Sequence, residues 1–358
     1  MIDRDKRFAI IGGGIAGLST AWFLQEEGYD NVTIIERSVD TTMEASGLNS
    51  GLVRHYHPDK VVRADLIRSV ELLSRYQERH SASFFEESPS LWLFRSDTFR
   101  ELDENTHDFL EVNTISPDQV PDRLKPELTF GQVWVRFEND GLLDAVEFGD
   151  QLHREVKQSN VDIRTSTSVQ SGEKRGDDWL LNLNENDELA TDVIVNAAGV
   201  WANEIAERLG LDPRDYEPVS RHLFFTKEQL IPESNSYYMD YNQRFFFRRT
   251  EEGTLISYCD EQPVEPGETK DVDFPRDHLD NVIGGSYPDL QLDEIDQYWS
   301  GQYAMTPDYK PMIDTDPTDP SVIWATGLND FGMSYGLRTG ERVMDQLRPG
   351  EYVYDVGV

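Results

Sequence analysis

The sequence predicts an α/β fold in which a discontinuous Rossmann-like nucleotide-binding domain carries a second, antiparallel β-sheet domain. Three observations predict it. Residues 8–37 follow a strand–turn–helix–strand pattern. Apolar runs typical of buried strands alternate with helical patterns in the centre and near the end of the chain. Residues 219–258 are rich in aromatic side chains and alternate in polarity, which is typical of antiparallel strands.

The first predicted elements are a buried strand and a glycine-rich turn. The apolar run Phe8–Ile11 is followed directly by Gly12-x-Gly14-x-x-Gly17, and a helical pattern then runs to Gly28. In the βαβ dinucleotide motif, Gly12 would permit the tight turn, Gly14 the approach of a pyrophosphate, and Gly17 the packing of helix on strand. The free N–H groups at the start of that helix favour phosphates.

The next element completes the motif. A second apolar run, Val32–Ile35, ends in Glu36, about 20 residues beyond the glycines, where an acid can accept hydrogen bonds from ribose hydroxyls. The glycine pattern alone would also fit an ordinary turn. With strand, helix, second strand and acid in order, we predict a dinucleotide site, which at this point could bind FAD or NAD.

Further periodic segments predict the remaining elements and two domains. We expect helices over residues 59–80, 143–157, 201–209 and 332–347, and strands over residues 91–94, 133–135, 161–164, 179–183, 193–195 and 322–324. The nucleotide-binding domain is predicted to comprise residues 1–85, 141–215 and 300–358, and the substrate-binding domain residues 86–140 and 216–299.

The charge of the chain is extreme. It has 68 acidic and 33 basic residues, which give a formal net charge of −35. Such a field repels phosphates, so we expect neither nucleic acid nor anionic membranes as partners. The acids are spread along the whole chain. This distribution favours the cytosolic protein of a halophile, in which salt screens self-repulsion, over an acidic protein of a mesophile.

Cysteine content and the absence of long apolar runs bear on location. Cys259 is the only cysteine, so no intramolecular disulfide can form. No apolar run reaches the roughly 18 residues of a membrane helix, and the first residues carry no apolar signal region. We therefore expect a cytoplasmic protein without a membrane span. The sequence carries no signal for an oligomeric state and none for a metal site.

Motifs in several separated segments of the chain add to the evidence from the glycine-rich turn. They lie in residues 8–37, 44–55, 195–202, 305–314 and 324–333. In this order they resemble the D-amino-acid oxidase family, which includes glycine oxidase, monomeric sarcosine oxidase and D-amino-acid dehydrogenases. The resemblance implies FAD rather than NAD. It also implies oxidation of a C–N bond by hydride transfer to flavin N5, followed by hydrolysis of the imine.

The resemblance implies FAD contacts along the whole chain. The backbone of Val169 would meet the adenine, and the helix that begins near Gly332 would stabilise negative charge on the reduced flavin. An ordinary polar loop, a strand-to-helix turn, a core valine and a glycine-started helix are the plain structural alternatives. The predicted cofactor-binding residues are Gly12, Gly14, Ile15, Ala16, Gly17, Glu36, Arg37, Ser46, Asn49, Ser50, Gly51, Val169, Ala197, Ala198, Gly199, Trp201, Gly327, Asp330, Phe331, Gly332, Met333 and Ser334.

Two residues are predicted to be catalytic. Arg54 matches the arginine that holds the substrate carboxylate in monomeric sarcosine oxidase, and a guanidinium binds a carboxylate in a bidentate fork. A surface arginine in an ion pair is the alternative. Tyr303 matches a tyrosine at the substrate face of the flavin, although it could equally be a packing residue.

The chain departs from its resemblance at the second carboxylate anchor. A lysine of sarcosine oxidase is replaced by Ser334, and the two arginines of glycine oxidase by Tyr303 and Asp330. The clamp is therefore half present unless another arginine completes it. The candidates are Arg221, Arg248 and Arg249.

Other departures concern the attachment of FAD and the electron acceptor. The cysteine and the histidine that carry FAD covalently in relatives fall at Gly301 and Leu48, so we expect non-covalent FAD. The oxygen-activating lysine falls near Leu255. Its loss favours a dehydrogenase or a slow oxidase, with oxygen, a quinone or an electron-transfer protein as the acceptor.

The sequence therefore predicts an FAD-dependent oxidoreductase that acts on an amino acid or an N-methyl amino acid. A flavin-dependent dehydrogenase of 2-hydroxy acids or glycerol 3-phosphate is the alternative within flavoenzymes. A non-catalytic FAD-binding subunit of a dehydrogenase complex is the alternative from another class, and an NAD-linked dehydrogenase is a third.

Overall fold

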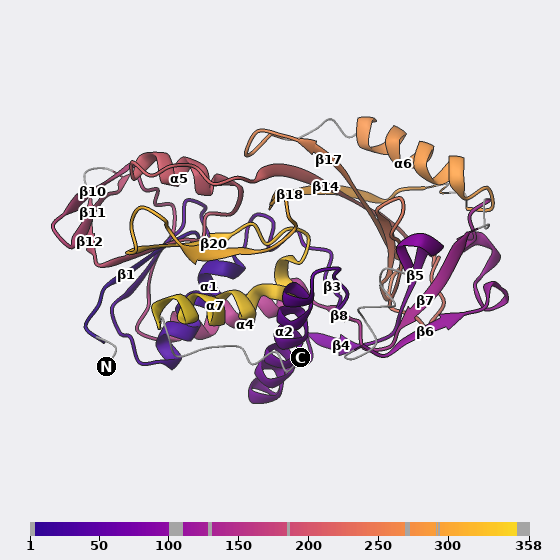
Figure 1. The fold of residues 1–358 in the computed structure, drawn as a ribbon, viewed down its shortest axis with the longest axis horizontal. Helices are drawn as coiled ribbons and strands as arrows, with labels where there is room; N and C mark the ends of the chain where they lie inside the picture. The colour runs from indigo at the N-terminus through magenta and orange to yellow at the C-terminus, as the bar shows by residue number, and fades with distance from the viewer. Residues whose placement is uncertain are drawn as a thin grey trace.

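Two β-sheets at opposite ends of an elongated molecule organise the fold (Figure 1). The structure, a computed structural model, describes residues 4–99, 110–127, 131–184, 187–268, 273–290, 292 and 294–348. Among these residues, no helix combines the length and the apolar character that crossing a bilayer requires.

The first sheet has six strands in the order β19-β20-β13-β1-β2-β9. Neighbours are parallel except β19, which is antiparallel to β20. All four residues of β1 are buried, because this central strand is covered on both faces. The strands are β1 (Phe8–Ile11), β2 (Val32–Ile35), β9 (Asp162–Arg164), β13 (Val193–Asn196), β19 (Met312–Thr315) and β20 (Val322–Thr326).

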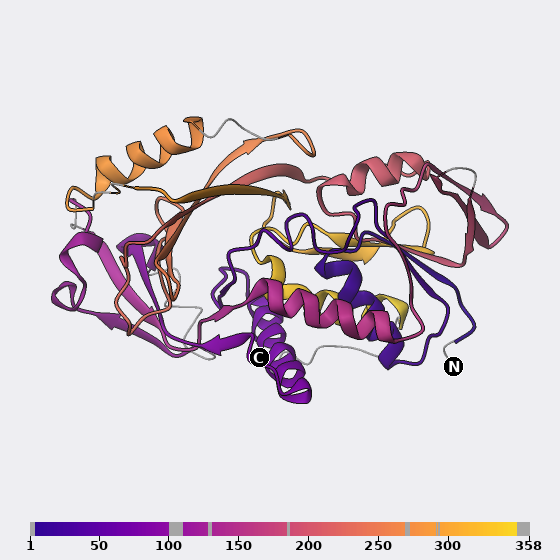
Figure 2. The same ribbon diagram turned by 180° about the vertical axis from the view of Figure 1, so that it is seen from behind.

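Helices cover one face of this sheet and a small antiparallel sheet covers the other (Figures 1 and 2). Helices α1 (Ile15–Glu26) and α7 (Gly336–Leu347) pack on the strands, while α4 (Ala145–Gln158) packs on α1 and α2 (Lys60–His80) packs on α7. The opposite face carries β10 (Ser171–Arg175), β11 (Asp178–Asn182), β12 (Glu188–Thr191) and α5 (Ala202–Arg208), which the 3-10 turn η4 (Gly199–Trp201) precedes.

The second sheet has eight strands in the order β18-β14-β17-β16-β15-β5-β7-β6. It is antiparallel except for the pair β15 and β5. Helix α6 (Asp273–Ser286) packs on its outer face. The strands are β5 (Ser90–Arg95), β6 (Val112–Ile115), β7 (Gln132–Phe137), β14 (Glu217–Thr226), β15 (Tyr237–Asp240), β16 (Phe245–Arg249), β17 (Thr254–Pro263) and β18 (Gln297–Met305).

Short elements complete the fold. A three-stranded sheet lies between the two larger sheets, and single 3-10 turns flank the longer elements. They are β3 (Leu52–Val53), β4 (Phe85–Glu87), β8 (Gly141–Leu143), η1 (Pro117–Gln119), η2 (Asp122–Leu124) and η5 (Gly332–Tyr335).

Helix boundaries follow from caps that the sequence contains. The Asp59 carboxylate accepts from the N–H groups of Val61 at 2.8 Å and Val62 at 3.2 Å, and thereby starts α2. Asp144 starts α4 in the same way. The helix predicted from Gly332 begins with η5 and becomes α-helical at Gly336. The predicted domain boundary at residue 300 falls within β18.

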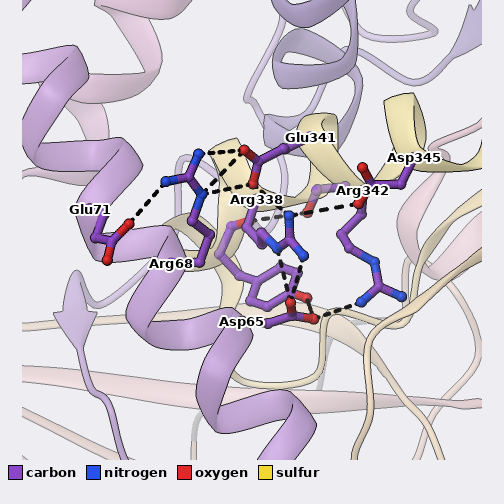
Figure 3. Close-up of polar contacts among 9 residues, drawn as sticks. Asp65, Arg68, Glu71, Arg338, Glu341, Arg342 and Asp345 are labelled. Carbon is purple, nitrogen blue, oxygen red and sulfur yellow. Dashed lines mark hydrogen bonds and ion pairs between the residues drawn. The ribbon is translucent and has the colours of Figure 1, made fainter. Parts of the chain in front are cut away.

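A buried ion network joins α2 to α7 (Figure 3). Arg338 is fully buried, and its Nε and Nη2 donate to Asp65 Oδ1 at 2.9 and 2.8 Å. Asp65 also accepts from Tyr335 Oη at 2.7 Å and from Arg342 Nη1 at 2.9 Å. The carboxylate thus has four donors, which fix how the last helix docks.

We expect Asp65→Ala to destabilise the protein by about 3–5 kcal/mol. The change removes the acceptor that Arg338, Tyr335 and Arg342 share, and it leaves Glu341 as the remaining close partner of the buried Arg338 guanidinium. The measurement is the free energy of unfolding in urea. Arg79→Ala is the control, since it removes a half-exposed ion pair with Glu26, worth about 1 kcal/mol or less, and a contact with the Trp22 ring at 5.8 Å. Equal losses for the two variants would contradict a structural role for the buried pair.

Candidate active site

A cavity of about 360 Å³ lies between the six-stranded sheet and the inner face of the eight-stranded sheet. Ile11 and Ile35, the last residues of β1 and β2, line one side of it. Leu223 of β14 and Phe246 of β16 line the other. Ligands of open α/β sheets bind at the carboxyl ends of the parallel strands, and this cavity has that position.

The glycine turn forms the floor of the cavity. Gly12 has φ +112°, and a Cβ there would lie 2.4 Å from the Ala197 carbonyl oxygen. A Cβ on Gly17 would lie 1.9 Å from the Gly12 oxygen. Only glycine permits these contacts, which bring the start of α1 against the end of β13. Gly14, Ile15 and Ala16 line the cavity, whereas Gly17 lies behind the turn.

Two predicted ligand-binding side chains also have partners within the protein. Glu36 Oε2 accepts from the Gly13 N–H at 2.7 Å and Oε1 from the Ser38 N–H at 2.6 Å. Ser46 Oγ accepts from the Ile15 N–H at 3.0 Å. Both residues line the cavity. They therefore hold the glycine turn in shape, a role that the sequence analysis did not assign to them.

Arginines and an indole ring form the wall near β9 and α5. The guanidinium carbon of Arg37 lies 3.5 Å from the Trp201 ring centroid, and Nη2 lies 3.0 Å from Glu44 Oε1. Val169 lines the cavity, and its carbonyl accepts from Arg208 Nη1 at 2.6 Å. Glu44 and Arg208 are cavity-lining residues that the sequence analysis missed.

Gly199 leaves room for a ligand. It has φ +57°, lines the cavity, and a Cβ there would meet no atom within 4 Å. Ala197 and Ala198 beside it are also small and line the cavity. A cradle of this kind, next to a helix N-terminus, fits the backbone and pyrophosphate of a dinucleotide.

The loop after β20 closes the cavity. Asn329 has φ +52°, its Oδ1 accepts from the Thr306 N–H at 2.8 Å, and its Nδ2 donates to the Gly327 carbonyl at 2.9 Å. These bonds fix the backbone that presents Asp330 and Gly332 to the cavity. Asn329 was not predicted as a site residue. Its positive φ, which is uncommon for a residue other than glycine and is visible only in the structure, is typical of functional loops.

Several predicted site residues lie outside the cavity. Asn49 and Ser50 line it, whereas Gly51 pairs with Leu143 instead. Met333 is fully buried in the core, and Ser334 Oγ donates to the Phe331 carbonyl at 2.7 Å. The predicted residues that do not line the cavity are Gly17, Gly51, Phe331, Met333 and Ser334.

Arg54 and Tyr303 converge at one end of the cavity with Arg221 and Asp330. Arg54 Nη2 is hydrogen-bonded to Asp330 Oδ1. Arg221 Nη2 lies 3.6 Å from Asp330 Oδ2 and donates to Tyr303 Oη at 3.3 Å. Arg221 and Tyr303 come from the neighbouring strands β14 and β18. The structure thus brings together a second arginine that the sequence named only as one of three candidates.

The other two candidates lie elsewhere. Arg249 forms an ion pair with Glu233 at 3.4 Å. The Arg248 side chain lies near Gly51, its Nε is buried, and burial lowers the pKa of its guanidinium. Neither residue lines the cavity.

At the end of the cavity where Arg54 and Tyr303 lie, two guanidinium groups and one carboxylate set the electrostatics. Partial burial raises the pKa of the Asp330 carboxyl, but Arg54 and Arg221 outweigh burial and lower it below its usual value. Burial lowers the pKa of His57, and the positive charge of Arg54 lowers it further. At neutral pH, Asp330 is therefore ionised and His57 is neutral.

A buried carboxylate fixes the segment after β3 that carries Arg54. Asp140 is fully buried. Its Oδ1 accepts from the His55 N–H at 3.0 Å, and its Oδ2 accepts from Ser90 Oγ and Tyr237 Oη, both at 2.5 Å. Because His55 follows Arg54 directly, this hub positions the arginine at the mouth of the site.

Gly301 and Leu48 are neighbours in the cavity wall. A Cβ on Gly301 would lie 3.4 Å from Leu48 Cβ, and both residues line the cavity. Neither residue carries a nucleophilic side chain.

Comparisons with known proteins agree with this geometry. Residues 7–346 match the family described as FAD dependent oxidoreductase (DAO). Mouse mitochondrial dimethylglycine dehydrogenase is 24% identical over 97% of this chain, but the chain spans only 43% of that relative.

Solved structures show the same fold. The L-proline dehydrogenase of P. horikoshii superposes with a TM-score of 0.84 at 22% identity, covering 98% of this chain and 96% of that one. Glycine oxidase from Geobacillus kaustophilus gives a TM-score of 0.80 at 17% identity, covering 99% and 97%. The predicted fold is confirmed, and the chain belongs to the DAO family of FAD-dependent oxidoreductases.

Proposed function

We propose that this chain oxidises the C–N bond of an amino acid or an N-methyl amino acid whose carboxylate is held by Arg54 and Arg221. The observation that carries the proposal is the convergence of both guanidinium groups and Tyr303 Oη at one end of the cavity that the glycine turn borders. Arg54 Nε is buried and has no hydrogen-bond partner within the described residues, so it is a donor that a substrate oxygen can satisfy.

The residues of this end bind and orient the substrate. Two guanidinium groups fix a carboxylate in position and direction, and this fixes the carbon next to it. The rings of Phe331 and Phe246 border the two arginines at 4.8 and 5.8 Å and limit the water around them. Bound FAD would supply the two-electron acceptor for the C–N bond.

This chain is much shorter than the first relatives that it matches. The chain spans less than half the length of the dimethylglycine dehydrogenases that it matches. The reaction proposed here is therefore that of this chain alone. We also propose an acceptor other than oxygen. The sequence match puts the oxygen-activating lysine of sarcosine oxidase near Leu255, which is buried and apolar, and no lysine is among the described residues that line the cavity.

We expect Arg54→Leu to raise KM for the amino-acid substrate about 100-fold or more, since a charged hydrogen bond to the carboxylate is lost. A panel of amino and N-methyl amino acids, followed by anaerobic bleaching of the flavin absorbance, identifies the substrate first. Arg249→Leu, outside the cavity, is the control. Unchanged kinetics of the Arg54 variant at full FAD content would remove Arg54 from the substrate site.

Gly199→Leu tests the position of FAD, because its side chain would enter the cavity. We expect the purified variant to lose most of its bound FAD, measured as flavin absorbance per protein. Gly210→Leu is a matched control: Gly210 also has positive φ and open space around it, but it does not line the cavity. Both variants carry the same backbone strain, so equal FAD content in the two would contradict the proposed position.

We also propose that FAD is bound non-covalently, since Gly301 and Leu48 carry no nucleophile. Acid precipitation of the holoprotein should leave all flavin absorbance in the supernatant. Flavin that stays with the precipitated chain would show a covalent link formed by another residue.

A further inference from the structure

The two arginines of the site are already in contact with a carboxylate of the protein itself. Asp330 Oδ1 is bound to Arg54, and Oδ2 lies 3.6 Å from Arg221. The Asp330 side chain is 28% exposed, while those of Arg54 and Arg221 are 15% and 17% exposed. Asp330 therefore stands on the more open side of the pair.

This placement is built into the loop. Asn329 holds the preceding backbone through Thr306 and Gly327, as described above. Arg54 in turn is fixed by the bond between His55 N–H and Asp140. Both partners of the Arg54–Asp330 contact thus come from segments that other interactions have ordered.

The charges that face this part of the cavity can be counted. Among the described residues that line it, the charged groups near Tyr303 are Arg54, Arg221 and Asp330. His57 packs on Phe331 nearby, and burial lowers its pKa, so it adds no charge at neutral pH. Among these described groups, two positive charges and one negative charge sum to +1, which one substrate carboxylate neutralises.

We propose that Asp330 is a specificity-determining residue that restricts this site to substrates with a single carboxylate and disfavours dicarboxylates and phosphate esters. The proposal rests on the proposed function, because it takes Arg54 and Arg221 as the carboxylate site. A second anionic group on the substrate would face Asp330, and the described residues at this end of the cavity offer no third cation to balance it. A charge within about 4–6 Å shifts protonation equilibria in proteins about tenfold to a thousandfold. We expect a like charge to weaken the binding of a second anionic group on the same scale.

The same carboxylate suits the other end of an amino acid. An ionised carboxylate accepts hydrogen bonds from an amine in either protonation state. A 2-hydroxy acid offers one donor at that position and no positive charge.

The test uses two probes that the enzyme cannot oxidise at a C–N bond, acetate and malonate, at about pH 8, where every carboxyl group is ionised. Dissociation constants for the FAD-bound protein are measured by isothermal titration calorimetry at constant ionic strength. The variants are Asp330→Asn and Asp330→Ser. Asp212→Asn, at an exposed position outside the cavity, makes the same change in net charge and is the control.

We expect wild type to bind acetate more tightly than malonate. Replacing Asp330 should lower the malonate dissociation constant about tenfold or more relative to that of acetate, and the control should leave the ratio unchanged. The Arg54→Leu variant should lose acetate binding, which shows that the probes occupy the site. An unchanged ratio of the malonate to the acetate dissociation constant in both Asp330 variants would overturn the inference. If the wild-type protein bound neither acetate nor malonate, the proposed carboxylate site would be contradicted as well.

Discussion

The packing of three backbone segments at the glycine turn is the constraint on which the rest of the structure depends. Gly12 lies against the carbonyl of Ala197, and Gly17 lies against Gly12 itself. A side chain at either glycine would displace α1 from β1 and β13. That displacement would move the helix N-terminus, and with it the surface that Glu36 and Ser46 hold in shape. The cavity is thus a product of close backbone packing rather than of a few side chains.

Much of this could be predicted from the sequence, because the signals are local. The βαβ motif is contiguous, and the caps Asp59 and Asp144 lie directly before their helices. Helix α6 was not predicted. Its sequence carries Pro275 in the first turn, where proline is tolerated, and the pair Gly284-Gly285 near its end, which weakens a helical pattern.

The substrate end could be predicted only in part, because its geometry depends on contacts between distant segments. Arg54 and Tyr303 were identified through the resemblance to relatives. The choice of Arg221 over Arg248 and Arg249 depends on strand register: β14 and β18 are adjacent, and Arg221 pairs with Gly301. No local pattern shows that the carboxylate of Asp140 orders the segment of Arg54 and His55, or that Asp330 contacts both arginines.

The pairing of β14 with β18 has a mechanical consequence. These strands join along nine consecutive residue pairs, from Glu217 with Met305 to Phe225 with Gln297. They extend from the edge of the six-stranded sheet into the eight-stranded sheet (Figure 1). A hydrogen-bonded ribbon of this length is stiff, so the two halves of the molecule have no free hinge along this connection. Exchange of small molecules with solvent then depends on local movement of loops and side chains at the cavity mouth, where the Asp330 loop lies.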